Sequence, residues 1–200
     1  MSFKLGNTNI SELYVGNSKI AQAYLGSSLV YQLPGPTDEV QIGNQIWKTK
    51  NLSIDDGQGG IYTQTVNYGQ GNVVEYYYTW NAAIRVANSI NGWHLPTVSE
   101  WNTLATTVGG NSIAGTKLKS TYGWQSGNGI DEYGFAVFPA GLINSGTLNN
   151  LGTIAYIWTA DPMALPSLAY HFRFETGAGA SSALISRSFG LSVRLVKDAT

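Results

Sequence analysis

The first pattern along the chain is a short apolar repeat with a period of ten residues. A large aliphatic residue precedes glycine at Leu5-Gly6, Val15-Gly16 and Leu25-Gly26. Apolar stretches interrupted by Gly and Asn are typical of brief strands joined by tight turns, and such units must stack on neighbours to bury an apolar face. We therefore predict a β-rich arm over residues 1–33 that packs on the rest of the chain, on copies of itself or on another protein.

Prolines mark the end of this arm. Pro34 and Pro36 flank a glycine, and this combination continues neither a helix nor a central strand. We place a linker at residues 34–38 and a main domain at residues 39–200. Apolar positions on both sides of Gly43-Asn44 predict that this domain begins with a hairpin.

Helical periodicity follows in two places. The first predicted helix has Thr79 as its N-cap and ends near Asn91-Gly92. The second begins with a capping box formed by Thr97 and Glu100 and ends before Gly109-Gly110.

Strand-like runs cover residues 73–80, 135–143, 154–159, 168–175 and 189–196. Since the two helices come early and most of the strands come late, the pattern predicts an α+β domain with a largely antiparallel sheet.

Composition excludes several classes of function. Charged residues make up 12% of the 200 residues and the net charge is −1, so the chain lacks the basic surface of a nucleic-acid binder and polybasic attraction to membranes. With no cysteine, thiol catalysis, thiolate metal sites and disulfides are excluded. No apolar stretch reaches the roughly 18 residues of a membrane span, and the start lacks the apolar core of a secretory signal. We expect synthesis in a cytoplasm.

The sequence shows no catalytic constellation. It has no Gly-x-Ser-x-Gly elbow, and Gly177-Ala178-Gly179 is not followed by the Lys-Ser/Thr of a phosphate-binding loop. Asp55-Asp56 could hold Ca²⁺ weakly, but adjacent carboxylates in a Gly-rich loop are usually a solvated turn. We expect neither enzymatic activity nor a cofactor or metal.

The candidate binding face lies between residues 161 and 188. Alternation along the strand 170–175 places Phe172 and Phe174 toward the core and predicts that His171, Arg173 and Glu175 point outward. Aromatic, Arg and Met side chains dominate interface cores, although an ordinary solvated sheet edge would show the same pattern. The candidate ligand-binding residues are Asp161, Met163, Leu165, Tyr170, His171, Arg173, Glu175, Ser182, Leu184, Ser186 and Ser188.

Several short motifs carry a family resemblance. They are Trp80-Asn81-Ala82-Ala83, Gly92-Trp93-His94-Leu95-Pro96-Thr97, Gly134-Phe135, Phe138-Pro139-Ala140-Gly141 and the closing run from Gly190 to Lys197. In this order they resemble the Fibrobacter succinogenes major paralogous domain family, from about Val40 to Lys197. The resemblance implies a C-type-lectin-like fold, with two helices around a twisted antiparallel sheet and chain ends close together.

The chain departs from this family in an informative way. Many secreted members carry cysteines at the places held here by residues 89–91 and by Leu195, so the chain does not depend on an oxidising compartment. Relatives of the fold include a copper oxidase that needs cysteines and iron enzymes that use three histidines, whereas this chain has only His94 and His171. A site of two histidines and one carboxylate is still arithmetically allowed. The calcium-dependent sugar-binding motifs of C-type lectins are missing.

The repeat arm followed by this domain is also similar to the variable proteins of diversity-generating retroelements. That resemblance implies a non-enzymatic ligand- or receptor-binding protein of a phage or prophage tail, located in the virion tail. The arm would bind a virion protein or form a homo-oligomer such as a trimer, and the domain would bind a host cell-surface protein or glycan. The alternative is a bacterial cell-surface adhesin or carbohydrate-associated module of the same family.

Overall fold

The computed structural model describes residues 3–5, 8–10, 14–15, 18–19, 22–25, 28–32, 38–177 and 179–199, and before residue 38 it describes backbone only. The chain divides into two units, Met1–Thr37 and Asp38–Thr200. Apart from Asp38, the predicted linker lies outside the described residues.

Each copy of the ten-residue pattern corresponds to one antiparallel hairpin of the first unit. The three hairpins pair β1 (Phe3–Leu5) with β2 (Thr8–Ile10), β3 (Tyr14–Val15) with β4 (Ser18–Lys19), and β5 (Gln22–Leu25) with β6 (Ser28–Gln32). Within the described residues, the repeat therefore corresponds to a series of two-stranded hairpins.

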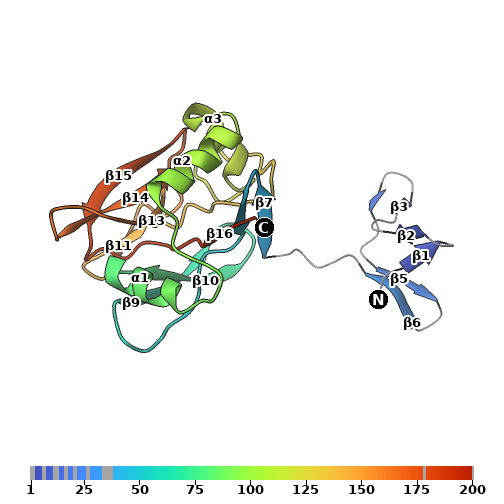
Figure 1. The fold of residues 1–200 in the computed structure, drawn as a ribbon, viewed down its shortest axis with the longest axis horizontal. Helices are drawn as coiled ribbons and strands as arrows, with labels where there is room; N and C mark the ends of the chain where they lie inside the picture. The colour runs from blue at the N-terminus through green and yellow to red at the C-terminus, as the bar shows by residue number, and fades with distance from the viewer. Residues whose placement is uncertain are drawn as a thin grey trace. The chain divides into compact units, whose positions relative to one another are not determined.

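The second unit begins with the predicted hairpin. Strands β7 (Glu39–Ile42) and β8 (Gln45–Lys48) pair across a turn in which Gly43 has a φ of +63°, a backbone conformation that favours glycine. The late strand β16 (Val196–Asp198) adds to the other edge of β8. The two ends of this unit thus lie side by side (Figure 1).

The predicted capping box is confirmed in α2 (Val98–Thr107), where the Thr97 side chain accepts a hydrogen bond from the Glu100 amide and the Glu100 carboxylate accepts from the Thr97 amide. The first predicted helix is α1 (Trp80–Asn88), which follows the hairpin of β9 (Ile61–Asn67) and β10 (Asn72–Tyr78). Its N-cap, Thr79, makes no side-chain capping bond.

A third helix, α3 (Asn111–Leu118), corrects the prediction of two helices. Its sequence contains Gly115 and has only a narrow buried stripe of Ala114, Gly115 and Leu118. Local periodicity is therefore weak, and packing against α2 and the late sheet stabilises the helix instead.

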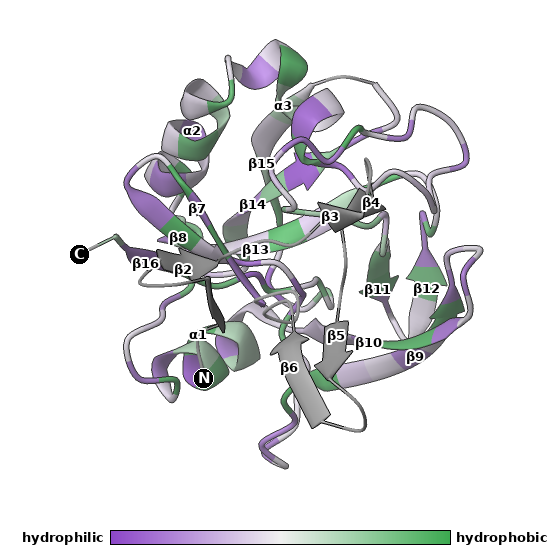
Figure 2. Ribbon diagram, turned by 90° about the vertical axis from the view of Figure 1, so that its right-hand side faces the viewer, coloured by the Kyte–Doolittle hydropathy of each residue, from purple (hydrophilic) through white to green (hydrophobic). Residues whose placement is uncertain are grey.

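The late sheet consists of β13 (Ala155–Pro162), β14 (Leu168–Phe174) and β15 (Ala180–Ser186), with β14 in the middle and both pairings antiparallel. Figure 1 shows α2 and α3 on one side of this sheet and α1 on the other. One core cluster joins α2 and α3 to Phe172 and Phe174, and a second joins α1 to Trp158 and Ala169. The hydropathy colouring in Figure 2 shows the apolar stretch of β13 passing between these layers.

Two predicted strands are largely irregular. The run 135–143 contains only the start of a strand, β11 (Leu142–Asn144), which pairs with β12 (Thr147–Asn149). The run 189–196 contains only the first residue of β16. A positive φ at Ala136 and Pro139 interrupt the first run, while the second makes single bridges such as Tyr78–Leu191. Both runs are apolar because they are buried on all sides. The domain is a mixed α+β structure with three helices and several small antiparallel sheets; the lectin-like topology stays a prediction.

Candidate functional site

The central strand β14 is buried on both faces, and this changes the predicted binding surface. Phe172 and Phe174 enter the core as expected, and Phe172 stacks on Trp101 with ring centroids 4.9 Å apart. The opposite face of the strand packs against the cluster around α1. The strand therefore has no face that is free along its whole length.

His171 is the clearest correction. It was expected to point outward, but only 2% of its surface is exposed, and its ring lies 5.5 Å from that of Tyr156. Neither ring nitrogen has a hydrogen-bond partner of ordinary geometry among the described residues. Burial, followed by the charge of Arg173, lowers the pKa of His171 to about 4, so this side chain is a neutral core residue at pH 7.

Strand register divides the other predicted residues between two surfaces. Tyr170 lies opposite Leu184, on the same face as Phe172, and Leu184 is 39% exposed. Ser182 and Ser186 share this face, which we call the Leu184 surface. Arg173 lies opposite Ser181 on the other face. The candidate residues therefore do not share one face of the sheet, and their role in binding stays a prediction.

The second surface is a small hollow beside Arg173. Its guanidinium Nε lies 3.2 Å from the Glu175 carboxylate and 3.4 Å from the Ser181 hydroxyl. Together with residues 177, 179 and 180, these side chains line a hollow of about 210 Å³. We call it the Arg173 hollow.

Lys119, which the sequence did not single out as a site residue, fixes one rim of this hollow. Its buried ammonium donates to the carbonyls of Gly127, Glu175, Thr176 and Gly177 at 2.5–3.3 Å. It also lies 4.4 Å from the centre of the Trp124 ring, and burial lowers its pKa. One cation therefore ties two loops together where β14 ends.

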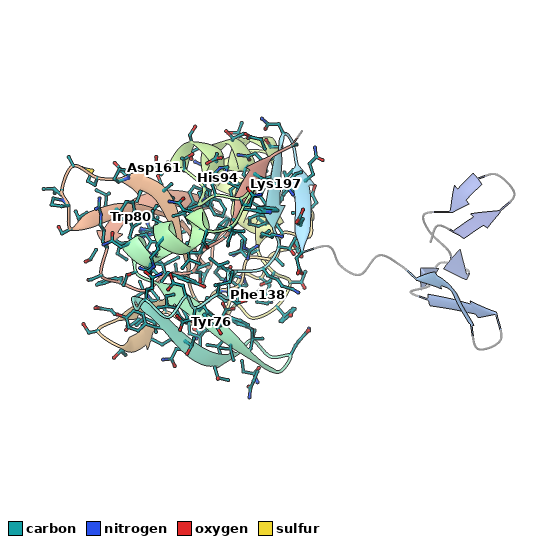
Figure 3. The ribbon with its side chains drawn as sticks, turned by 60° about the horizontal axis from the view of Figure 1, so that its bottom comes forward. Tyr76, Trp80, His94, Phe138, Asp161 and Lys197 are labelled. Carbon is teal, nitrogen blue, oxygen red and sulfur yellow. The ribbon has the colours of Figure 1, made fainter. Side chains whose placement is uncertain are left out.

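The predicted loop after β13 is partly structural. Asp161 lies near the end of β13 (Figure 3), and its carboxylate accepts a hydrogen bond of 2.6 Å from the Val98 amide at the start of α2. Met163 is half-buried, whereas Leu165 is 56% exposed. The hydroxyls of Ser186 and Ser188 lie 2.9 Å apart at the end of β15.

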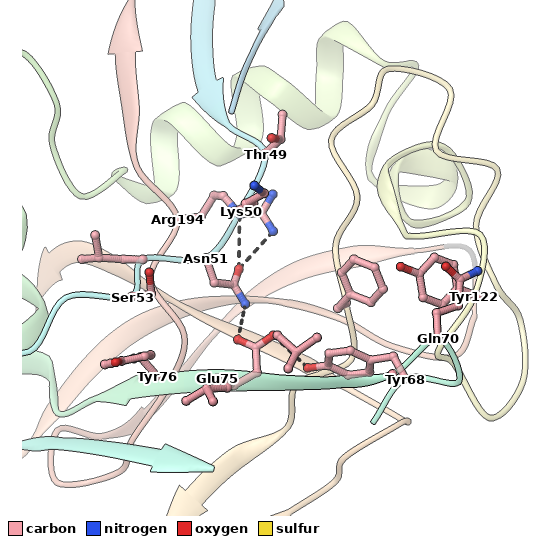
Figure 4. Close-up of a pocket in the computed structure, with 15 residues that line it drawn as sticks. Thr49, Lys50, Asn51, Ser53, Tyr68, Gln70, Glu75, Tyr76, Tyr122 and Arg194 are labelled. Carbon is pink, nitrogen blue, oxygen red and sulfur yellow. Dashed lines mark hydrogen bonds between the residues drawn. The ribbon is translucent and has the colours of Figure 1, made fainter. Parts of the chain in front are cut away.

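A hollow beside β10 was not predicted from the sequence. It has a volume of about 300 Å³ and lies between residues 49–53 and residues 73–76 of β10, with Tyr68, Tyr122 and Phe138 at one end (Figure 4). We call it the β10 slot. Figure 3 labels Tyr76 and Phe138 on this side of the domain.

A hydrogen-bonded network forms one wall of the slot. Glu75 is 8% exposed and accepts from the Asn51 amide at 3.2 Å and from the Tyr68 hydroxyl at 3.1 Å. The Asn51 carbonyl in turn accepts from the Arg194 guanidinium at 3.0 Å. Burial raises the pKa of Glu75, and the hydrogen bonds from Asn51 and Tyr68 and the charge of Arg194 offset this only in part.

Arg194 is 1% exposed and holds the closing segment in place. It donates to the backbone carbonyls of Lys48 and Phe135 as well as to Asn51, and it lies over the Phe135 ring at 4.9 Å. Burial lowers its pKa to about 10, so it remains charged at pH 7.

Asp56 and His94, two possible metal ligands, pair with neighbouring side chains. Asp56 pairs with Arg85 at 2.6 Å, and this hydrogen bond lowers the pKa of Asp56 to about 2. His94 pairs with Glu100 at 2.6 Å and lies beside Lys197 in Figure 3. Within the described residues, no group of three or more His, Cys, Asp or Glu side chains could hold a metal ion. None of the helices in that part of the chain is long and apolar enough to cross a membrane.

Comparison with known proteins agrees with the motif order found in the sequence. The model of the Fibrobacter succinogenes major domain matches residues 40–197. No match was found among curated proteins or among solved structures. Since the match covers nearly all of the second unit, the chain belongs to the Fibrobacter succinogenes major domain family.

Proposed function

We propose that this protein is a non-enzymatic ligand- or receptor-binding module that uses the outer strand of its late sheet. The observation that carries the proposal is the contrast within that sheet. Phe172, Phe174 and Trp158 are fully buried, whereas Ser181 and Ser182 of β15, one on each face, are exposed. A fixed scaffold with a variable outer layer suits recognition, because surface side chains can change without loss of the core.

We assign binding to the Leu184 surface and to the Arg173 hollow, each for its own reason. The Leu184 surface combines Tyr170 with the exposed Leu184 and two serines, a mixture of apolar and polar groups found at interfaces. The Arg173 hollow presents Arg173 on a rim that Lys119 holds rigid. A rim held in one conformation loses little entropy when a ligand binds.

The finer proposal is a phage or prophage tail protein on a C-type-lectin-like scaffold, diversified by a retroelement. Family membership, the lack of cysteine and the three repeated hairpins of the first unit support it. The virion tail would be its location, the first unit would attach it or form the oligomer, and a host cell-surface protein or glycan would be its ligand. The alternative is a bacterial cell-surface adhesin of the same family. Flanking DNA that carries a near-copy of the late coding stretch, differing mainly at adenines, would support the retroelement.

The binding test uses the full chain, labelled with a fluorophore and incubated with intact bacterial cells and with a glycan array. Arg173→Ala and Leu184→Ser are compared with Thr63→Ala, an exposed position on β9. We expect each of the first two variants to weaken binding about tenfold while Thr63→Ala binds like wild type. Equal binding by all folded variants would contradict the proposal, as would turnover of a compound at the Arg173 hollow.

A further inference from the structure

The outer edge of β10 carries unpaired backbone groups. In an antiparallel pair, residues alternate between those that exchange hydrogen bonds with the partner strand and those that point away. Tyr78 exchanges both bonds with Leu191, on the side away from β9. The N–H and C=O groups of Tyr76 and Val74, two and four residues earlier, therefore point to this same side.

These groups open into the β10 slot. Four consecutive residues of β10, 73–76, line the slot, whereas a hollow on one face of a strand would be lined by alternate residues. Among the described residues, no hydrogen bond joins the outward backbone groups of Val74 or Tyr76 to any partner. The slot is thus bounded by a strand edge.

Two exposed valines indicate what shape would fill the slot. Val73 is 46% exposed and Val74 is 53% exposed, and as neighbours in a strand they lie on opposite faces of the hairpin. A compact molecule on one face would cover only one of them. A segment lying along the edge would cover both, because side chains of paired strands stand next to each other on each face.

The charge in the slot favours a basic side chain on that segment. The Glu75 carboxylate accepts only from Asn51 and Tyr68, both neutral donors, and it makes no ion pair within the described residues. The Arg194 guanidinium is occupied by Asn51 and by backbone carbonyls, and Lys50 pairs with Asp38 at 2.8 Å. A buried carboxylate is stabilised when a cation reaches it, and the packed rings of Tyr68 and Phe138, 4.9 Å apart, offer an apolar surface beside which the cation's stem would lie.

We propose that the β10 slot binds an extended peptide segment of a partner protein, which adds as a strand to the Val74–Tyr76 edge and places a Lys or Arg side chain at Glu75. Strand addition to a free sheet edge is a general mode of peptide recognition, in which backbone bonds supply affinity and side-chain pockets supply specificity. This site is separate from the Leu184 surface and the Arg173 hollow, so it stands or fails independently of the proposed function.

The test selects binders from a displayed library of random linear peptides on the full chain, then measures each as a synthetic peptide. Val74→Pro removes the outward N–H, a change that an edge strand tolerates. The matched control is Thr65→Pro. Thr65 faces Val74 across the hairpin, and its N–H points from β9 to the opposite edge.

We expect Val74→Pro to weaken the selected peptides about tenfold, while Thr65→Pro binds them like wild type. Replacing the peptide's basic residue by norleucine, or Glu75 by Gln, should weaken binding by a similar factor. In wild type, the amides of Val74 and Tyr76 should exchange with solvent quickly when free and slowly with peptide bound. The measurements with the norleucine peptide, with Glu75→Gln and of amide exchange use no proline variant, so they do not depend on the folding of those variants.

Three outcomes would overturn this inference. They are a selection that returns no peptide, peptides that bind Val74→Pro and wild type equally, and binders without a basic residue that are indifferent to Glu75→Gln. Binding of glycans alone at the slot, with no change in the amide exchange of Val74 or Tyr76, would also reject a peptide ligand.

Discussion

At the residue scale, His171 shows that a side chain predicted to be exposed from strand alternation can be buried by the rest of the fold. Alternation along β14 correctly separates Phe172 and Phe174 from His171 and Arg173. It does not reveal that α1 and its cluster cover the second face. Which side chains share a face is a property of one strand, whereas exposure depends on what packs against it.

A buried neutral histidine makes stability depend on pH. The folded-state pKa of His171 is about 4, below the 6.5 of an exposed histidine, so the unfolded chain binds the proton more readily between these values. Its contribution to stability is present above pH 6.5 and is lost as the pH falls toward 4, by about 3 kcal/mol. We expect His171→Phe to remove this dependence, measured as the difference between the two proteins in urea unfolding from pH 7 to pH 4. Parallel curves for both proteins would contradict it.

Arg194 illustrates a residue whose importance the sequence understates. Its guanidinium donates to three backbone carbonyls, those of Lys48, Phe135 and Ala136, and to Asn51 from a fully buried position. We expect Arg194→Lys to lower the free energy of unfolding by about 3 kcal/mol, because an ammonium cannot reproduce the planar fork and leaves buried acceptors unpaired. Arg173→Lys, at a half-buried surface position, is the control and should change stability by less than about 0.5 kcal/mol. A similar loss of unfolding free energy in Arg194→Lys and Arg173→Lys would contradict this role of Arg194.

At the scale of elements, the sequence predicts correctly those features that depend on residues close together in the chain. The capping box of α2 needs only Thr97 and Glu100, and the β7–β8 turn needs only Gly43. The helix α3 and the buried runs near Phe135 and Leu191 depend on tertiary packing, so sequence periodicity misread them. The β10 slot could not be predicted at all, since residues 49–53, 73–76 and Arg194 meet only in the folded domain.

The four carbonyl contacts of Lys119 allow a prediction about a pair of loops. Lys119→Met keeps the length of the side chain but removes the ammonium, and we expect faster amide exchange at residues 127–128 and 175–177. Ligand binding at the Arg173 hollow should weaken at the same time. Lys117→Met, two residues earlier, removes the ion pair with Glu132 and the contact with the Tyr133 ring, neither of which involves these loops, and it should leave both measurements unchanged. Unaltered exchange in Lys119→Met would show that other contacts hold the loops.

At the scale of the whole molecule, the two units are predicted to have different tasks. The described residues of the first form three two-stranded hairpins, and an isolated hairpin of this length is marginal in water. We therefore expect the full chain to form an oligomer through them and a chain that starts at Asp38 to be monomeric. Light scattering measures the mass of each, and circular dichroism checks that the shorter chain is folded. A monomeric full chain would argue against this role.

The position of the closing segment has a consequence for how this protein is made. Residues 191–196 bridge to Tyr78, Ile157 and β8, and they carry Arg194. They follow most of the second unit in the chain, so until they are synthesised the nascent chain leaves Trp47, Trp158 and Phe135 incompletely covered. Such long-range closure makes folding slow and leaves newly made chains open to aggregation, so production should respond to chaperone supply and growth temperature more than thermal stability alone suggests.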